Sequence, residues 1–160
     1  MKLIKIIFTV LIVLTVSCKN NTEKSEINPI QNDSKTQFDV TTATAIIEKR
    51  NKDFEDALKA GDSIAVGDIY TIDSKIIGSY AGRDNLISEV HGLVQDSITD
   101  IRFKIINIWG NENIIVEDAY VEFYHINGTL VSNGNSLFVW KKEKDKWRIF
   151  RDVYKSQKIE

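Results

Sequence analysis

Residues 114–128 read IIVEDAYVEFYHING, and this stretch decides the fold class. Between Ile114 and Ile126 the residues alternate with a period of two, as in a strand that has one buried and one exposed face. Asn127-Gly128 follows, and both residues tolerate the positive φ that the central positions of a type I′ hairpin turn require. The stretch therefore predicts an antiparallel hairpin whose second strand begins at Thr129.

The two faces of the first strand differ in composition, and the difference indicates which face is buried. One face carries Glu117, Ala119, Val121 and Phe123, and the other carries Asp118, Tyr120, Glu122 and Tyr124. The first set is mostly apolar, which favours it as the core face and leaves Glu117 as a carboxylate directed inward. The alternative is that the second face lines a pocket, with Tyr120 donating a hydrogen bond and Asp118 or Glu122 accepting a proton.

The pattern on either side of this hairpin predicts the remaining elements. We expect further strands at 74–80, 101–109, 129–142 and 146–154, with Asn133-Gly134 as a bulge or a second tight turn. The spacing of apolar residues predicts helices at 42–60, 63–70 and 83–95. Thr41 or Thr42 would cap the first helix, Gly61 would end it and Asp62 would cap the second.

This order of elements predicts one α+β domain. Helices followed by hairpin-linked strands are typical of N-terminal helices packed on a curved antiparallel sheet. A curved sheet leaves a gap between its concave face and the helices, and gaps of this kind hold small-molecule sites.

Three groups of residues resemble one protein superfamily. Ala60-Gly61-Asp62 with Ile69-Tyr70 is similar to its first helical hairpin, and Gly82-Arg83 with Leu86-Ile87 is similar to the start of its third helix. Residues 138–142 (FVWKK), 146–149 (KWRI) and 152–154 (DVY) resemble its closing hairpin. On these motifs, residues 41–156 resemble the SnoaL-like branch of the cone-shaped nuclear transport factor 2 and ketosteroid isomerase superfamily.

The resemblance implies a pocket inside the cone, and it leaves the activity open. Its members include isomerases, dehydratases, cyclases, hydrolases and binding modules, so the fold does not settle what this chain does. Many relatives pair through the open face of the sheet, which implies a homodimer here. The pocket residues expected in this sequence are Tyr70, Trp109, Tyr120, Trp140, Asp152 and Tyr154.

Enzymes with this fold commonly use a carboxylate or histidine in the cone as a general base. The candidates here are Asp152, Glu117 and Asp118. Asp152 shares a face with Phe150 and Tyr154, and an apolar pocket would raise its pKa toward the working pH. The alternative is an ion pair between Asp152 and a neighbouring arginine or lysine. The remaining titratable candidates are more typical of turns and of solvated positions; these are Asp73, His91 and His125.

Several kinds of site lack their sequence signals. The two histidines and the single cysteine form no ligand spacing for a metal, and no glycine-rich phosphate loop or nucleophile triad is visible, so we expect neither metal nor cofactor. Lys and Arg number 21 against 23 Asp and Glu, for a net charge of −2. An acidic chain without a basic patch is not expected to bind nucleic acid.

The N-terminus predicts export. Lys2 and Lys5 precede an apolar run from Ile6 to Val16, which is too short to span a bilayer and fits a secretory signal. Thr15-Val16-Ser17-Cys18 resembles the lipobox of bacterial lipoproteins, with Thr15 where a leucine is usual. The resemblance implies cleavage after a signal of residues 1–17 and attachment of lipid to Cys18. The alternative is an ordinary cleaved signal with an incidental thiol at Cys18.

The other boundaries follow from composition. Residues 18–40 are polar and predict a flexible tether, residues 41–156 form the SnoaL-like domain, and residues 157–160 form a tail. The sequence thus predicts an envelope lipoprotein, anchored to a bacterial membrane, whose domain binds a small apolar or amphipathic ligand. Two alternatives stay open: a protein-interaction module of the envelope, and a cofactor-free isomerase or dehydratase that uses a pocket carboxylate.

Overall fold

The structure is a computed structural model that describes residues 38–158. The predicted signal at 1–17, Cys18 and nearly all of the predicted tether lie outside the described residues, as do the last two residues of the tail. Among residues 38–158, no helix has both the length and the hydropathy needed to cross a membrane.

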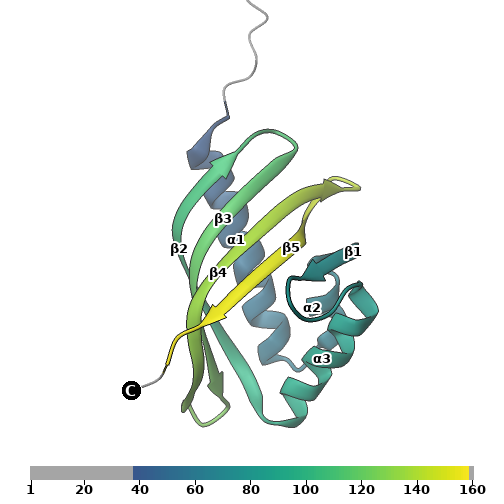
Figure 1. Cartoon of the computed structure of the whole chain (residues 1–160), viewed down its shortest axis with the longest axis vertical. Helices are drawn as coiled ribbons and strands as arrows, with labels where there is room; N and C mark the ends of the chain where they lie inside the picture. The colour runs from purple at the N-terminus through teal and green to yellow at the C-terminus, as the bar shows by residue number, and fades with distance from the viewer. Residues whose placement is uncertain (1–37, 159–160) are drawn as a thin grey trace, which may run out of the picture. The chain divides into compact units, whose positions relative to one another are not determined.

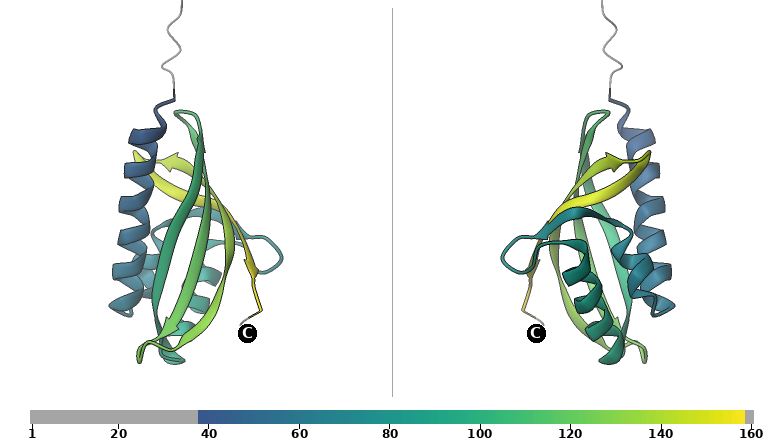
Figure 2. Two further views of the ribbon diagram at one scale, coloured as in Figure 1. Left: turned by 90° about the vertical axis from the view of Figure 1, so that its left-hand side faces the viewer. Right: turned by 90° about the vertical axis from the view of Figure 1, so that its right-hand side faces the viewer.

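The domain is the predicted α+β arrangement, with helices on one face of a curved sheet (Figures 1 and 2). Five strands lie in the order β1-β5-β4-β3-β2, and the last four in sequence pair as antiparallel neighbours. The helices are α1 (Val40–Lys59), α2 (Ser63–Gly67) and α3 (Arg83–Gln95). The strands are β1 (Tyr70–Ile76), β2 (Ile98–Gly110), β3 (Ile114–His125), β4 (Leu130–Glu143) and β5 (Lys146–Ser156).

One pairing differs from the expected antiparallel sheet. β1 runs parallel to β5, so the sheet is mixed. The chain leaves β1 through α3 and enters β2 at the opposite edge of the sheet, so no hairpin constrains the direction of β1. β1 also starts at Tyr70 rather than at residue 74, because the second helix ends at Gly67 instead of Tyr70.

The helix caps were predicted in part. Asp62 caps α2 as expected, and its Oδ1 accepts a hydrogen bond of 2.9 Å from the amide of Ala65. Gly61 follows α1 with a φ of 71°, which suits glycine. The cap of α1 is Asp39, whose carboxylate accepts from the amide of Thr41 at 3.0 Å; the prediction of Thr41 or Thr42 was wrong.

The turn with two consecutive residues of positive φ was predicted between β3 and β4, but the structure has it between β4 and β5. Between β3 and β4 only Gly128 has a positive φ, of 83°, so this is not a type I′ turn. The two residues with consecutive positive φ are Lys144 and Asp145, at 50° and 62°, in the tight turn between β4 and β5. Asn133-Gly134 makes no turn, since it pairs regularly with β3, and the irregularity lies beside it between Ser132 and Leu130.

A β-bulge in β5 decides which of its side chains face the helices. Trp140 pairs with Ile149 but Val139 pairs with Arg151, so Phe150 is the extra residue. Phe150 and Arg151 therefore share the outer face, where the Arg151 guanidinium lies 3.5 Å from the centre of the Phe150 ring. The bulge places Ile149 and Asp152 both on the inner face, although they are three residues apart.

The core lies between α1 and the inner face of the sheet. α1 contributes Ile47, Phe54 and Leu58, and the sheet contributes Trp140 and Val121 among others, all buried. Figure 2 shows α1 along one face of the sheet, while no helix of the described residues covers the other face. That outer face exposes Leu137 and Val153, which pair across β4 and β5. The homodimer through this face stays a prediction.

Candidate ligand-binding site

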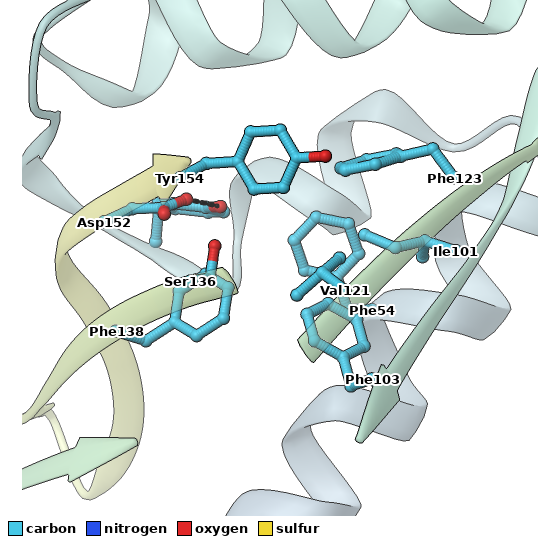
Figure 3. A pocket seen from close by; sticks show the side chains of 10 residues that line it. Phe54, Ile101, Phe103, Val121, Phe123, Ser136, Phe138, Asp152 and Tyr154 are labelled. Atoms are coloured by element: carbon cyan, nitrogen blue, oxygen red, sulfur yellow. Dashed lines mark hydrogen bonds between the residues drawn. The ribbon is translucent and has the colours of Figure 1, made fainter. Parts of the chain in front are cut away.

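A small cavity lies between α1 and the concave face of the sheet, where the sequence predicts a pocket (Figure 3). Its volume is about 50 Å³. Six aromatic side chains, two of them tyrosines, line it together with two aliphatic side chains, one serine and one aspartate: Phe54, Tyr70, Phe103, Phe123, Phe138, Tyr154, Ile101, Val121, Ser136 and Asp152. The cone is thus mostly filled by its own side chains, and the space left is small and apolar with one polar end.

Asp152 supplies the carboxyl of this polar end. The bulge at Phe150 directs Asp152 inward from β5, and only 6% of the residue is exposed. Its Oδ2 accepts a hydrogen bond of 3.0 Å from the hydroxyl of Tyr70 at the start of β1. Its Oδ1 is buried and has no hydrogen-bond partner. A buried oxygen without a partner is costly, so a group that donates a hydrogen bond to this atom from within the cavity would be stabilised.

Burial controls the protonation of Asp152. Desolvation raises its pKa from 3.8 to about 7, and the hydrogen bond from Tyr70 opposes that rise only in part. The hydroxyl of Tyr70 has its own pKa held well above 10, first by burial and then by the charge of Asp152. Near neutral pH, Asp152 therefore exchanges between a carboxylate and a carboxylic acid, while Tyr70 remains a hydrogen-bond donor.

Ser136 extends the polar end of the cavity. It lies on β4 diagonally across from Asp152, since Ser136 pairs with Tyr154 and Phe138 pairs with Asp152. Figure 3 shows the Ser136 hydroxyl pointing toward the end of the cavity that holds Asp152. A ligand in the cavity would thus meet a carboxyl and two hydroxyls at one end and rings elsewhere.

Phe123 and Tyr154 form the half-buried part of the wall. Their rings meet edge to face with centres 5.6 Å apart. The Tyr154 hydroxyl lies 2.6 Å from the hydroxyl of Ser132, which fixes the ring in this position. Since both rings reach solvent, they stand where a ligand would enter.

Glu117 is a second buried carboxyl, but it is not part of the cavity wall. Its two oxygens accept hydrogen bonds from Asn51 Nδ2 at 2.6 Å and from Trp140 Nε1 at 2.9 Å. Burial raises its pKa from 4.5 to about 7, against the lowering effect of these two bonds. Glu117 pairs with Phe138 across the strands, and Phe138 pairs with Asp152, so Phe138 lies between the two acids in one cross-strand row.

The structure brings together three of the six predicted pocket residues. Tyr70, Asp152 and Tyr154 line the cavity. Trp140 does not line it. Its indole is fully buried in the core, where Nε1 donates a hydrogen bond to Glu117. Tyr120 lies on the outer face of β3, and Trp109 is 46% exposed near the end of β2.

The other carboxylate candidates lie away from the cavity. Asp118 lies on the outer face of β3, where Asn107 donates to it at 3.4 Å, and Glu122 lies on the same face. Asp73 is exposed and pairs with Lys141 at 3.3 Å. The outcome fits the apolar-face argument for β3, which directs Glu117 inward and the Asp118 set outward.

Sequence reasoning missed Ser136 and the phenylalanines as wall residues. The alternation of β4 places Ser136 and Phe138 on one face, so the period of two could have identified them. Phe54 lies within the predicted helix at 42–60, where the apolar spacing does not separate a core residue from a cavity residue, because both give the same pattern. Among residues 38–158, no group of three or more His, Cys, Asp or Glu is placed to hold a metal ion.

Comparison of this chain with known proteins gives matches among solved structures, and these show the fold. No protein-family profile matches this chain, and no curated protein matches it in sequence. Among solved structures, an NTF-2 like protein of unknown function from Shewanella oneidensis matches with a TM-score of 0.61 and 18% identity, over 70% of this chain and 98% of that one. A ketosteroid isomerase-like protein from Erwinia carotovora matches with a TM-score of 0.56 and 21% identity, over 72% and 96% of the two chains.

A third structure agrees with these two. A domain of unknown function with a cystatin-like fold from Nostoc punctiforme matches with a TM-score of 0.64 and 12% identity, over 76% of this chain and 81% of that one. The chain has the nuclear transport factor 2-like fold. At these identities the nuclear transport factor 2-like domain is shown as a fold, and its function has to be argued from the cavity.

Proposed function

We propose that this chain is a lipid-anchored envelope protein whose nuclear transport factor 2-like domain binds a small, mostly apolar molecule with one polar group. The observation that carries the proposal is Asp152, a buried carboxyl at the end of an aromatic cavity with one oxygen unpartnered. The ligand's polar group would meet Asp152, and its apolar part would contact rings such as Phe138 and Tyr154.

The volume of the cavity sets the size of this ligand. One water needs about 10–15 Å³ of such space, so a cavity of about 50 Å³ accepts about three to five non-hydrogen atoms as it stands. Typical pockets for drug-sized ligands are roughly 300–1,000 Å³, far larger than this cavity. A larger ligand would require Phe123 and Tyr154 to move, because they form the wall that reaches solvent.

The test is to fill the cavity. Ser136→Val adds bulk at the polar end, and Asn135→Val places the same new side chain at the neighbouring exposed position on the outer face. Binding of tert-butanol, a small molecule with an apolar body and one hydroxyl, is followed by NMR titration of the full chain. We expect Ser136→Val to weaken binding at least tenfold and Asn135→Val to leave it unchanged. Equal binding by both variants, or no saturable binding by the unaltered chain, would contradict the proposal.

A proton-transfer enzyme is a second candidate for the same cavity. The observation that favours it is the pairing of Asp152, with a pKa of about 7, and the Tyr70 hydroxyl at 3.0 Å. A carboxyl that titrates near neutral pH takes and returns protons efficiently, and a neighbouring hydroxyl can stabilise developing negative charge. Here Asp152→Asn should abolish turnover of a substrate while the chain stays folded. Unchanged turnover would remove Asp152 from any mechanism.

The location rests on the N-terminal sequence alone. The lysines at the start, the apolar run to Val16 and Cys18 support export followed by acylation. The test is fractionation of cells that express the full chain or its Cys18→Ala variant. The unaltered chain should sediment with membranes and the variant should be released in soluble form. Retention of Cys18→Ala on the membrane would count against a lipid anchor.

A further inference from the structure

We propose that the ligand of this cavity is a small organic ammonium ion. The inference rests on the proposed function, because it names the chemical class that the same cavity would take. It is argued from three properties of the cavity: the charge at its polar end, the character of its wall and its size.

The polar end of the cavity carries an acid with no counter-charge. No lysine, arginine or histidine is among the residues that line it. Arg151 precedes Asp152 in the chain, but its guanidinium lies on the outer face over the ring of Phe150. The ionisable groups that act on Asp152 or lie beside it on the inner side are Tyr70 on β1, Tyr80 after β1, Glu117 on β3 and Tyr154 on β5 itself. None of these is cationic. A ligand with a positive charge would supply the missing partner of the buried carboxylate, whereas an anionic ligand would be repelled.

The wall also suits a cation. Six of the ten lining residues are Phe or Tyr, and aromatic rings attract organic cations such as methylated ammonium groups. The remaining wall is aliphatic apart from Ser136 and Asp152, so it accepts methyl or methylene groups rather than a strongly hydrated metal ion. A cavity with room for about three to five non-hydrogen atoms fits a small alkylammonium no larger than tetramethylammonium.

The protonation of Asp152 gives the inference a distinctive signature. An ammonium ion binds the carboxylate, so its affinity should rise as the pH rises through the pKa of Asp152, which burial places at about 7. A neutral hydrogen-bond acceptor would instead prefer the carboxylic acid and bind more tightly as the pH falls. The direction of the pH dependence therefore distinguishes the two classes of ligand.

The experiment compares tetramethylammonium with tert-butanol, which has nearly the same shape and no charge. Binding to the full chain is measured by calorimetry in buffers without organic amines, because such amines would compete. If only ionised Asp152 binds the cation, tetramethylammonium should bind about 30-fold more tightly at about pH 8 than at about pH 5.5. At the higher pH it should also bind at least about tenfold more tightly than tert-butanol.

Three variants assign the effect to the carboxylate. Asp152→Asn should remove the preference for the cation over tert-butanol and the pH dependence of that preference. Asp118→Asn is the matched change on the outer face of β3, and it should alter neither the preference for the cation nor its pH dependence. Tyr70→Phe removes a hydrogen bond that lowers the pKa of Asp152, so it should move the midpoint of the pH dependence upward. This third variant keeps the carboxylate and tests the assignment even if Asp152→Asn fails to fold.

The outcomes separate this inference from the proposed function. Binding of tert-butanol with equal or weaker binding of tetramethylammonium would overturn the ammonium class and leave the small-molecule site in place. A tetramethylammonium affinity that does not change with pH or with Asp152→Asn would also overturn it. Binding of neither probe would overturn the proposed function together with the inference.

Discussion

At the scale of single residues, the buried acid Asp152 lowers the stability of the folded domain, as polar residues of binding sites often do. Its pKa is raised from 3.8 to about 7, which means that folding disfavours the carboxylate. Most buried positions in proteins carry an apolar residue or a paired charge, whereas the one hydrogen bond to the side chain of Asp152 comes from Tyr70. Residues that lower stability in this way are common at functional sites.

Asp152→Asn should therefore stabilise the domain at alkaline pH. The amide keeps an acceptor for Tyr70 and removes the charge, so we expect a gain of roughly 2 kcal/mol in the free energy of unfolding at about pH 8. At about pH 3 the gain should nearly vanish, because Asp152 is then protonated in both the folded and the unfolded chain. Urea denaturation at the two values of pH measures both. A loss of stability at the higher pH would mean that Asp152 is paired in a way the structure does not contain.

Glu117 differs from Asp152 because both of its oxygens are satisfied. Glu117→Gln should keep the network, since the Asn51 amide can turn and accept from the new amide while Trp140 still donates to the oxygen. Glu117→Ala should destabilise the domain by about 3 kcal/mol or more, because it opens a cavity and leaves two buried donors unpaired. Thermal unfolding of the two variants tests this contrast. Equal melting temperatures would show that the network contributes little.

At the scale of elements, the position of Asp152 depends on a bulge that the sequence does not announce. Strict alternation groups Asp152 with Phe150 and separates it from Ile149. The extra residue Phe150 shifts the phase, so Ile149 and Asp152 share the inner face. Such a bulge depends on contacts across two strands, here the stacking of Phe150 under Lys141 and Arg151. The sequence therefore predicted correctly that Asp152 faces the cavity, but it wrongly placed Phe150 on the same face.

Elements whose patterns are local were predicted well. The third helix was expected at residues 83–95, and it spans Arg83–Gln95. The faces of β3 follow its alternation. The direction of β1 could not be predicted, because it depends on which edge of the sheet is free after the hairpins form.

Gly134 offers a test of the packing between β4 and β5. A Cβ on Gly134 would lie 2.1 Å from the backbone oxygen of Lys155, a contact that no rotamer change relieves. Gly134→Ala should therefore destabilise the domain by at least about 2 kcal/mol. Gly92 in α3 has nothing within 4 Å of its added Cβ, so Gly92→Ala should be neutral or stabilising by about 0.5–1 kcal/mol. Equal effects of the two changes on urea denaturation would contradict the packing of β4 against the end of β5.

At the scale of the whole molecule, the two buried acids should make stability depend on pH. Their pKa values are raised from 3.8 and 4.5 to about 7, so between these limits the folded chain holds protons that the unfolded chain has lost. Stability should therefore fall as the pH rises from about 4 to about 7, by at least about 2 kcal/mol, and then level off.

The acid side of the profile has a different cause. Asp39 and Asp73 have pKa values lowered by hydrogen bonds, so their contribution is lost when the pH falls below about 4. The domain should be most stable at about pH 4. The double variant Asp152→Asn with Glu117→Gln should flatten the profile between about pH 5 and about pH 8. A profile that rises over this range in the unaltered chain would show that the two acids are ionised when buried.

The fold of residues 38–158 could be predicted, while the cavity could be predicted only in part. Helices before hairpin-linked strands indicated the cone, and three aromatic or acidic wall residues were identified. The volume of the cavity depends on how rings from α1, β2, β3 and β4 meet, which no local pattern encodes. Trp140 is an example. The sequence around it is compatible with a pocket wall and with the core, and the hydrogen bond to Glu117 shows that it belongs to the core.

The central claim is that a small molecule binds inside the cone beside Asp152. The most direct measurement is the set of NMR nuclear Overhauser contacts between bound tert-butanol and assigned side chains of the chain. The methyl protons of the probe should contact the rings of Phe138 and Tyr154, which line the cavity. Contacts confined to Leu137 and Val153 on the outer face would contradict the claim and place the binding surface on the open side of the sheet.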